Sequence, residues 1–342
     1  MLIDRVQSAA PLPAGAEEDY RAIRTAAGIT DVSAMGKFHL RGAAMEALDR
    51  LVAGNLNRLM ENSIRWTAIL DEDGRVVADV QVYNRFDSYL VTCAPAQRAA
   101  VAELLAALGP DDEVEDATDT LAAIAVEGPL ALDIPHAIVG MDGSGLGLLK
   151  FVDVDVFGRQ VLLSRIGFSG EYGYVFFLDP ADAPQLVERI VEVCPAARVC
   201  GPEIQDRLRL EVRAYTPASH FLRGETALQA GLHWMIDFRK DAFQGRDAVM
   251  AEKAAGLVRR LLGFTLDGSA VPAPGTPVTD GADAVGYVAA AAWSPALERT
   301  IGLVYLDEAY ACVGVPLGVE GGALRTVSTP FLTTQSTRAA AR

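Results

Sequence analysis

The sequence predicts an α+β fold that is followed by a small β-barrel. Through the first two thirds of the chain, stretches with helical and with strand periodicity are mixed, as in α+β proteins. The strongest strand signal, over residues 63–94, reads as three successive antiparallel strands. From residue 257 onward, short strands separated by Gly and Pro show almost no helical periodicity, which indicates a barrel or sandwich.

The chain divides into two regions and a tail. With 342 residues it is too long for one ordinary core, which favours two domains. The pattern changes after residues 245–256, so we place a first region at residues 1–250 and the β-barrel at residues 257–333. We expect the terminal residues 334–342 to be frayed.

The first region begins with helices around a β-meander. The expected elements are a helix at 17–28 closed by Gly28, a strand at 33–42, a helix at 43–54, the meander at 63–94 and a helix at 96–109. The first hairpin of the meander turns at DEDG, where Gly74 supplies the positive φ that such a turn requires.

The rest of this region is expected to alternate strands and helices. Residues 120–135 form a strand that turns at Gly128, and further strands and helices follow at 150–156, 159–165, 173–178, 181–194 and 202–213. The closely spaced glycines of residues 140–150 are interpreted as a loop, because no β-branched run leads into them as in a dinucleotide-binding turn.

Composition excludes several classes of function. A net charge of -15 argues against a nucleic-acid surface, which needs a basic patch. No apolar window is long enough to span a membrane, and the N-terminus lacks a signal-peptide pattern, so we expect a cytoplasmic protein without membrane partners. The four cysteines include no CxxC pair and have no His at ligand spacing, so we expect reduced thiols and no metal site.

One carboxylate stands out in the strand GRVVADVQVY at residues 74–83. Period-two alternation places Asp79 on one face with Val77, Gln81 and Tyr83, opposite an apolar face of Val76, Ala78, Val80 and Val82. Asp is disfavoured in strands, but it is common on a solvated strand face. From this stretch alone, Asp79 is either an ordinary surface residue or a functional carboxylate.

Two further stretches have the same ambiguity. In RIGFSGEYGY, residues 165–174, a Gly at every third position is consistent with a structural turn or with close approach of the backbone to a ligand. In RLRLEVRAYTPASHF, residues 207–221, Arg209 and Glu211 interrupt an apolar pattern, as a structural ion pair or a ligand clamp would.

In order and spacing, these stretches resemble the folate-dependent aminomethyltransferase family, the T-protein of the glycine cleavage system and its relatives. The resemblance runs from about residue 17 to residue 332 and rests on these segments: IRWTAILDEDGRVVADVQVY, IAVEGPLA, RIGFSGEYGYVFFL, DRLRLEV, LQAGLHWMIDFRKDAFQGRDAVM and GYVAAAAWSPALERTIGLVYL. It implies a ring of three lobes, two α+β lobes and the barrel, with tetrahydrofolate in the central hole.

The resemblance also implies roles for individual residues. Asp79 matches the family's functional Asp beside the pterin nitrogens, where a carboxylate stabilises positive charge or moves a proton during transfer of the one-carbon unit. Cofactor or substrate contacts are implied for Trp66, Tyr83, Cys93, Arg165, Phe168, Glu171, Tyr172, Val175, Arg209 and Trp234. The expected substrate is a small one-carbon donor.

Several recognition positions depart from the family pattern. Val175 stands where the family has a Glu that binds the guanidine-like edge of the pterin, a loss of roughly 1 to 3 kcal/mol of binding. Other family polar groups are replaced by Cys93, Gln205, Gln229 and residues 289–291. We therefore expect a specialised methyl or aminomethyl transferase or demethylase rather than the glycine cleavage enzyme, and no lipoyl carrier protein as partner. The alternatives are an enzyme of this fold that acts on another small molecule, and a non-catalytic binding protein.

Overall fold

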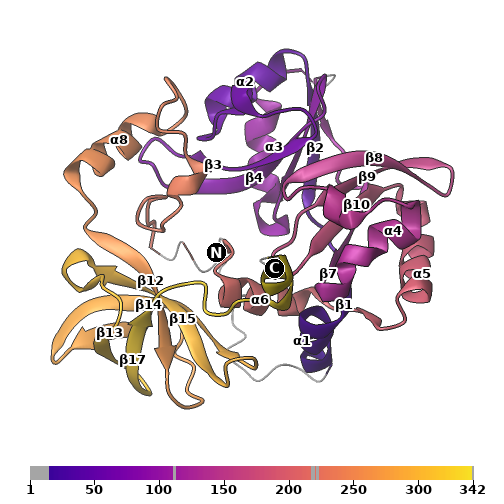
Figure 1. The fold of residues 1–342 in the computed structure, drawn as a ribbon. Helices are drawn as coiled ribbons and strands as arrows, with labels where there is room; N and C mark the ends of the chain where they lie inside the picture. The colour runs from indigo at the N-terminus through magenta and orange to yellow at the C-terminus, as the bar shows by residue number, and fades with distance from the viewer. Residues whose placement is uncertain (1–14, 111–112, 217–219, 221–222, 341–342) are drawn as a thin grey trace.

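The computed structural model describes residues 15–110, 113–216, 220 and 223–340, and confirms the α+β prediction. Two α+β lobes and a barrel are arranged around a common centre (Figure 1). The two lobes share one eleven-stranded sheet in the order β11-β1-β7-β10-β9-β8-β3-β4-β5-β2-β6. The lobes meet between β3 and β8, where Ser63 pairs with Lys150.

The predicted meander forms the centre of the first lobe. Its strands are β3 (Ser63–Leu70), β4 (Val76–Asn84) and β5 (Ser88–Cys93), followed outward by β2 (Gly36–Arg41) and β6 (Val114–Asp116). Gly74 has a φ of 78° in the hairpin turn, as the sequence predicts. The helices α2 (Ala43–Leu51) and α3 (Arg98–Ala106) contribute apolar residues to one core with Ala78, Val80 and Val82, so the apolar face of β4 is buried as expected.

The second lobe is built on the other half of the sheet. Its strands are β7 (Ala122–Glu127), β8 (Lys150–Val156), β9 (Arg159–Arg165), β10 (Gly173–Leu178), β1 (Ala27–Asp31) and β11 (Ala197–Val199). Its helices are α1 (Ala16–Thr25), α4 (Ile134–Val139), α5 (Ala183–Val193) and α6 (Gln205–Val212). The α5 residues Leu186 and Ile190 pack into one apolar core with Phe176 of β10.

The third lobe is a closed barrel, as the sequence predicts. Its strands follow the order β12-β15-β14-β13-β16-β17, and α8 (Arg246–Ala255) precedes it. The strands are β12 (Arg259–Leu266), β13 (Pro277–Asp280), β14 (Asp283–Ser294), β15 (Arg299–Asp307), β16 (Pro316–Val319) and β17 (Gly322–Val327).

The predicted role of Gly28 as a helix cap is wrong. Helix α1 ends at Thr25, and Gly28 lies in β1, where it pairs with Glu127 and Arg198. A Cβ atom at Gly28 would lie 2.3 Å from Cγ1 of Ile23. The glycine is therefore needed for the close packing of α1 on its own following strand.

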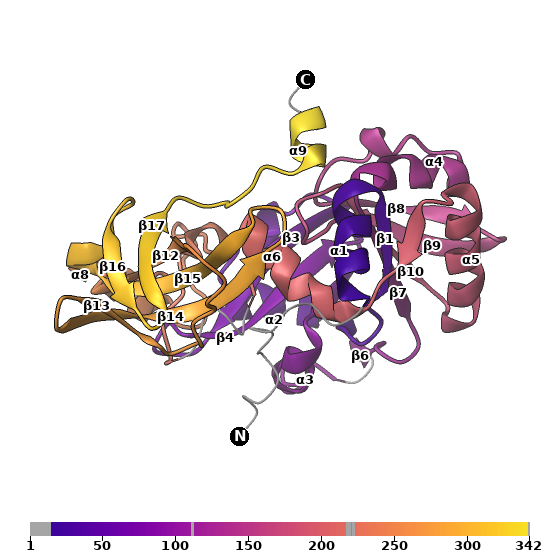
Figure 2. The ribbon, with the colours of Figure 1, turned by 90° about the horizontal axis from the view of Figure 1, so that it is seen from below.

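The expectation that residues 334–342 are frayed is also wrong for the described part of this segment. Residues Gln335–Ala340 form helix α9, at the end of the segment that leaves the barrel (Figure 2). The Ser336 backbone N–H and hydroxyl donate to Oε2 of Glu171 at 2.9 and 2.7 Å, and the Thr334 hydroxyl donates to the Gly170 carbonyl at 2.6 Å. These bonds fasten the C-terminal segment to the second lobe.

A buried carboxylate, Glu211 of α6, joins the lobes. Its Oε2 accepts hydrogen bonds from Nη2 and Nε of Arg24 at 2.7 and 3.1 Å. Its Oε1 accepts from the hydroxyls of Tyr20 at 2.7 Å and of Ser294, in the barrel, at 2.6 Å. The ion pair that the sequence suggested around Glu211 therefore exists, but its cation is Arg24 of α1.

No helix in the described part of the chain is long and apolar enough to cross a membrane.

Candidate functional site

Asp79 lies in the middle of β4 on the face opposite the α2 and α3 core. Its neighbours Ala78 and Val80 belong to that core, so the pleat directs Asp79 to the other side of the sheet. Only 7% of the residue is exposed. The indole Nε1–H of Trp66, on the adjacent strand β3, donates to Asp79 Oδ2 at 2.6 Å. Asp79 Oδ1 is buried and has no hydrogen-bond partner among the described residues.

This environment raises the pKa of Asp79. Burial is the main cause, because it disfavours the charged carboxylate. The hydrogen bond from Trp66, the nearby Gln97 side chain and the positive charge of Arg209 act in the opposite direction. The result is a carboxylate that water solvates poorly and that has one oxygen without a hydrogen-bond partner among the described residues.

Aromatic side chains surround the Trp66 indole. Its ring centroid lies 5.2 Å from that of Phe168, 5.5 Å from that of Trp234 and 6.4 Å from that of Tyr215, in each case edge to face. The guanidinium carbon of Arg209 lies 3.7 Å from the Phe168 ring centroid. Residues from β3, the 166–172 loop, α6 and the short helix His233–Met235 thus meet beside Asp79.

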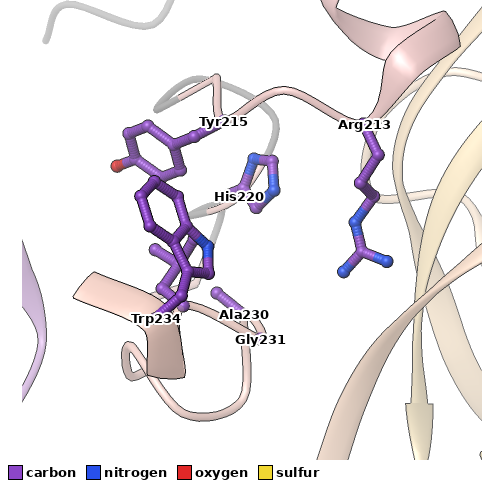
Figure 3. A pocket seen from close by; sticks show the side chains of 7 residues that line it. Arg213, Tyr215, His220, Ala230, Gly231 and Trp234 are labelled. Carbon is purple, nitrogen blue, oxygen red and sulfur yellow. The ribbon is translucent and has the colours of Figure 1, made fainter. Parts of the chain in front are cut away.

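A cavity of about 260 Å³ opens next to this aromatic cluster. Its lining includes Tyr215, His220, Trp234 and Arg213, and Figure 3 shows the first three rings gathered on one side with Arg213 across from them. Burial lowers the pKa of His220 to about 4, so this imidazole is neutral at physiological pH. The cavity therefore offers flat apolar walls and one cationic side chain.

Glu127 at the end of β7 fixes the glycine-rich loop that carries Phe168. Its Oε1 accepts hydrogen bonds from the backbone N–H groups of Phe168 and Ser169 at 2.6 and 3.1 Å. A Cβ atom at Gly167 would lie 2.5 Å from this oxygen. The glycine therefore permits the close approach of the Glu127 carboxylate. This contact explains one of the regularly spaced glycines of residues 165–174 without a ligand.

Tyr83 and Val175 lie together in a different environment. Both belong to an apolar cluster between the two lobes, with 0% and 6% of the residue exposed. The Tyr83 ring centroid lies 5.5 Å from that of Phe151 and 5.6 Å from that of Phe177. The Tyr83 hydroxyl is buried and has no hydrogen-bond partner among the described residues.

Four other predicted site residues make their contacts outside the Asp79 cluster. Cys93 pairs with Val80 and packs into the core on the opposite face of the sheet, where burial raises its thiol pKa to about 12. Arg165 donates to the Leu146 carbonyl at 2.6 Å and stacks on Tyr172, and Glu171 binds Ser336 of the C-terminal segment. The structure thus brings together Asp79, Trp66, Phe168, Arg209 and Trp234.

Sequence reasoning missed several residues of this site. Tyr215 and His220 lie in the segment 207–221, in which only Arg209 and Glu211 were singled out. Their aromatic rings were the sequence feature that could have indicated a wall of the site. Gln97, at the end of the short helix Pro95–Gln97 before α3, gave no signal, because its position near Asp79 depends on tertiary packing.

Comparisons with known proteins agree with this architecture. Residues 8–240 match the GCVT N-terminal domain, and residues 259–332 match the glycine cleavage T-protein C-terminal barrel domain. Similar curated proteins include the aminomethyltransferase of Rubrobacter xylanophilus, 35% identical over 315 residues that cover 90% of this chain and 81% of the relative. The aminomethyltransferase of Synechococcus elongatus is 33% identical over 317 residues, which cover 90% of this chain and 84% of the relative.

A solved structure shows the same fold. The aminomethyltransferase T of the glycine cleavage system from Bartonella henselae has a TM-score of 0.85 and 20% identity, and the match covers 94% of this chain and 91% of that chain. Two domain matches together span nearly all of the chain, and the curated relatives are similar over most of their length. The chain therefore belongs to the glycine cleavage T-protein family.

Proposed function

We propose that this protein is a tetrahydrofolate-dependent one-carbon transferase that acts on a small methyl or aminomethyl donor. The observation that carries the proposal is the buried Asp79, whose Oδ2 is held by Trp66 while its Oδ1 has no partner among the described residues. The similar curated proteins are aminomethyltransferases, which supports this class of reaction.

The residues beside Asp79 fit the reacting end of a folate. When bound, tetrahydrofolate supplies the nitrogens that carry the one-carbon unit. The Oδ1 of Asp79, which has no partner among the described residues, accepts an N–H group, and the rings of Trp66 and Phe168 offer apolar surfaces to a flat ligand. The fit is poorer at the expected guanidine-like edge, because the Val175 side chain offers no acceptor there.

Asp79 acts in this proposal through charge and position. Its carboxylate stabilises positive charge that develops on the transferred carbon unit, or takes a proton from the nitrogen that receives it. The Trp66 hydrogen bond fixes the orientation of the carboxylate before the ligand arrives. The low exposure of Asp79 strengthens both effects, because little water competes for the charge.

A second candidate is an enzyme of this fold whose substrate is another small molecule. The observation that favours it is the apolar cluster of Tyr83 and Val175, in which the polar recognition group expected for a pterin is missing. The absence of family polar groups at residues 289–291 also leads us to propose that no lipoyl carrier protein takes part. A non-catalytic binding protein is the third candidate, and it requires that Asp79 carry out no chemistry.

Thermal unfolding with folate ligands separates these candidates. We expect tetrahydrofolate and 5-formyltetrahydrofolate to stabilise the protein, by about 2.7 kcal/mol at a concentration one hundred times the dissociation constant. The absence of any shift at millimolar folate would refute the first candidate and leave the second. Detection of a one-carbon product from any donor would eliminate the non-catalytic candidate.

A further inference from the structure

A second cavity, of about 220 Å³, shares Trp234 with the cavity of Figure 3. Its lining contains three arginines, Arg58, Arg65 and Arg239, together with Asn55 and Asp237. Trp234 is 55% exposed and also contacts Trp66, the hydrogen-bond partner of Asp79. The arginine cavity therefore adjoins the proposed reaction site through a pair of indole rings.

A buried lysine fixes the two walls of this cavity to each other. Lys240 Nζ donates to the backbone carbonyls of Asp49, Val52 and Gly54, the last two at 2.8 and 3.0 Å. It also lies 3.2 Å from the Asp49 carboxylate, and Asp49 Oδ1 accepts from the Leu56 N–H at 2.7 Å. The bonds of Lys240 thus connect the segment that contains Asn55 and Arg58 to the segment that contains Asp237 and Arg239.

Hydrogen bonds of the cavity floor add to this rigidity. The Gly54 N–H donates to the Thr67 hydroxyl oxygen at 2.7 Å, and that hydroxyl donates to the Met235 carbonyl at 3.1 Å. The Asp237 N–H donates to the Ala53 carbonyl at 3.0 Å. The backbone around the cavity is therefore held in place without using the arginine side chains.

The arginine side chains themselves are largely uncompensated. In the described part of the chain, neither the Arg58 nor the Arg65 side chain makes a hydrogen bond or a salt bridge, and Arg239 meets Asp237 at 3.4 Å with 77% of its side chain exposed. Three positive charges face one carboxylate, in a protein whose net charge is -15. Asn55 Oδ1 is also buried without a partner among these residues, so an N–H acceptor accompanies the cations.

We propose that the arginine cavity binds the α-amino or α-amido carboxylate group of a ligand of the transfer reaction. Guanidinium groups bind carboxylates through paired, charge-assisted hydrogen bonds, and Asn55 Oδ1 accepts the N–H next to that carboxylate. This inference rests on the proposed function for its choice of ligand. Two sources share the chemistry: the glutamyl end of tetrahydrofolate and the main-chain groups of an amino-acid donor.

Binding measurements with two probes test the proposal and identify the source. N-(4-aminobenzoyl)-L-glutamate represents the glutamyl end, and sarcosine represents an amino-acid donor. We expect one probe to bind the wild-type protein in calorimetry, and to bind the Arg58→Gln/Arg65→Gln variant at least about tenfold more weakly. Arg325→Gln, in the barrel, is the matched control, because Arg325 lies in β17 and is exposed.

The outcomes are distinct. Loss of N-(4-aminobenzoyl)-L-glutamate binding assigns the cavity to the cofactor tail, and loss of sarcosine binding assigns it to the donor. Binding of neither probe at millimolar concentration, or equal affinity in the double variant and the Arg325→Gln control, would overturn the proposal. Asp79→Asn is expected to keep probe binding while losing transfer activity, so failure of the cavity assignment and failure of the proposed function are measured separately.

Discussion

Two buried carboxylates, Glu211 and Asp79, differ in how many of their oxygens accept hydrogen bonds. Glu211 accepts hydrogen bonds on both oxygens from Arg24, Tyr20 and Ser294. Asp79 accepts one from Trp66 on Oδ2, and its Oδ1 has no partner in the described part of the chain. Both residues are nearly inaccessible, with 0% and 7% exposed.

The difference distinguishes a structural carboxylate from a functional one. A buried charge is tolerated when partners compensate it, and Glu211 has partners from α1 and the barrel. Asp79 keeps a solvation cost that the protein itself does not remove, which is expected where a ligand completes the site.

Replacing Glu211 should have the largest effect on stability. Glu211→Ala leaves the Arg24 guanidinium buried without its main partner, and we expect a loss of about 3 to 5 kcal/mol in the free energy of unfolding. Urea unfolding followed by fluorescence measures it. Glu192→Ala, which removes an exposed partner of Arg189, is the control and should cost at most about 0.5 kcal/mol. Equal losses in the two variants would contradict the structural role of Glu211.

Replacing Asp79 should affect turnover instead of folding. We expect Asp79→Asn to reduce the rate of one-carbon transfer by about 10²- to 10³-fold, because the amide cannot stabilise positive charge or accept a proton. Single-turnover kinetics with tetrahydrofolate and the donor measure the rate. Asp153→Asn, on the surface near Arg85, is the matched control and should retain full activity. An active, folded Asp79→Asn protein would reduce Asp79 to a structural residue.

The pH dependence of stability tests whether the Asp79 carboxylate is poorly compensated in the folded protein. Because burial raises the pKa of Asp79 in the folded state, the folded protein binds this proton more tightly than the unfolded chain does. The stabilising contribution is complete below the ordinary pKa of Asp and is lost as the pH rises through the folded-state pKa. Asp79→Asn should therefore gain stability relative to wild type as the pH rises from acid to neutral. A constant difference across this range would contradict the raised pKa.

Adding an acceptor to the apolar cluster should have a smaller effect. We expect Val175→Glu to bind tetrahydrofolate about tenfold more tightly, because it restores an acceptor at the expected pterin edge. The unliganded variant should be less stable than wild type, since a carboxylate then lies beside Tyr83 in an apolar cluster. Calorimetric titration measures the affinity, and Val175→Gln, a neutral acceptor, should give a smaller gain. A folded Val175→Glu protein without tighter binding would favour the candidate that uses another substrate.

Local patterns predicted most of the elements correctly. The strands at 150–156, 159–165 and 173–178 have the predicted bounds, because alternating β-branched and apolar residues between turn signals are local information. Gly28 was misjudged because its place in β1 depends on pairing with Glu127 and Arg198, which are far along the chain. The C-terminal segment was misjudged because Ser336 binds Glu171, 165 residues earlier.

The site was predictable only in part. Asp79 and Trp66 were within reach, since a hairpin of known register brings residues of adjacent strands together. Alternation alone also grouped Tyr83 with Asp79, although Tyr83 packs between the lobes against Phe151 and Phe177. Period-two alternation predicts on which face of a strand a side chain lies. It does not predict which lobe packs against each part of that face.

By itself, the sequence determined the strand pattern, the late β-barrel and the presence of a carboxylate at an improbable strand position, because these follow from side-chain periodicity and backbone preference. Only the tertiary structure decided which carboxylate is compensated. The partners of Glu211 come from residues 187 and 191 positions earlier and 83 later in the chain, and the aromatic neighbours of Trp66, which holds Asp79, come from three separate segments. Solvation of a buried charge depends on groups a few ångströms away, and the packing of the lobes selects those groups.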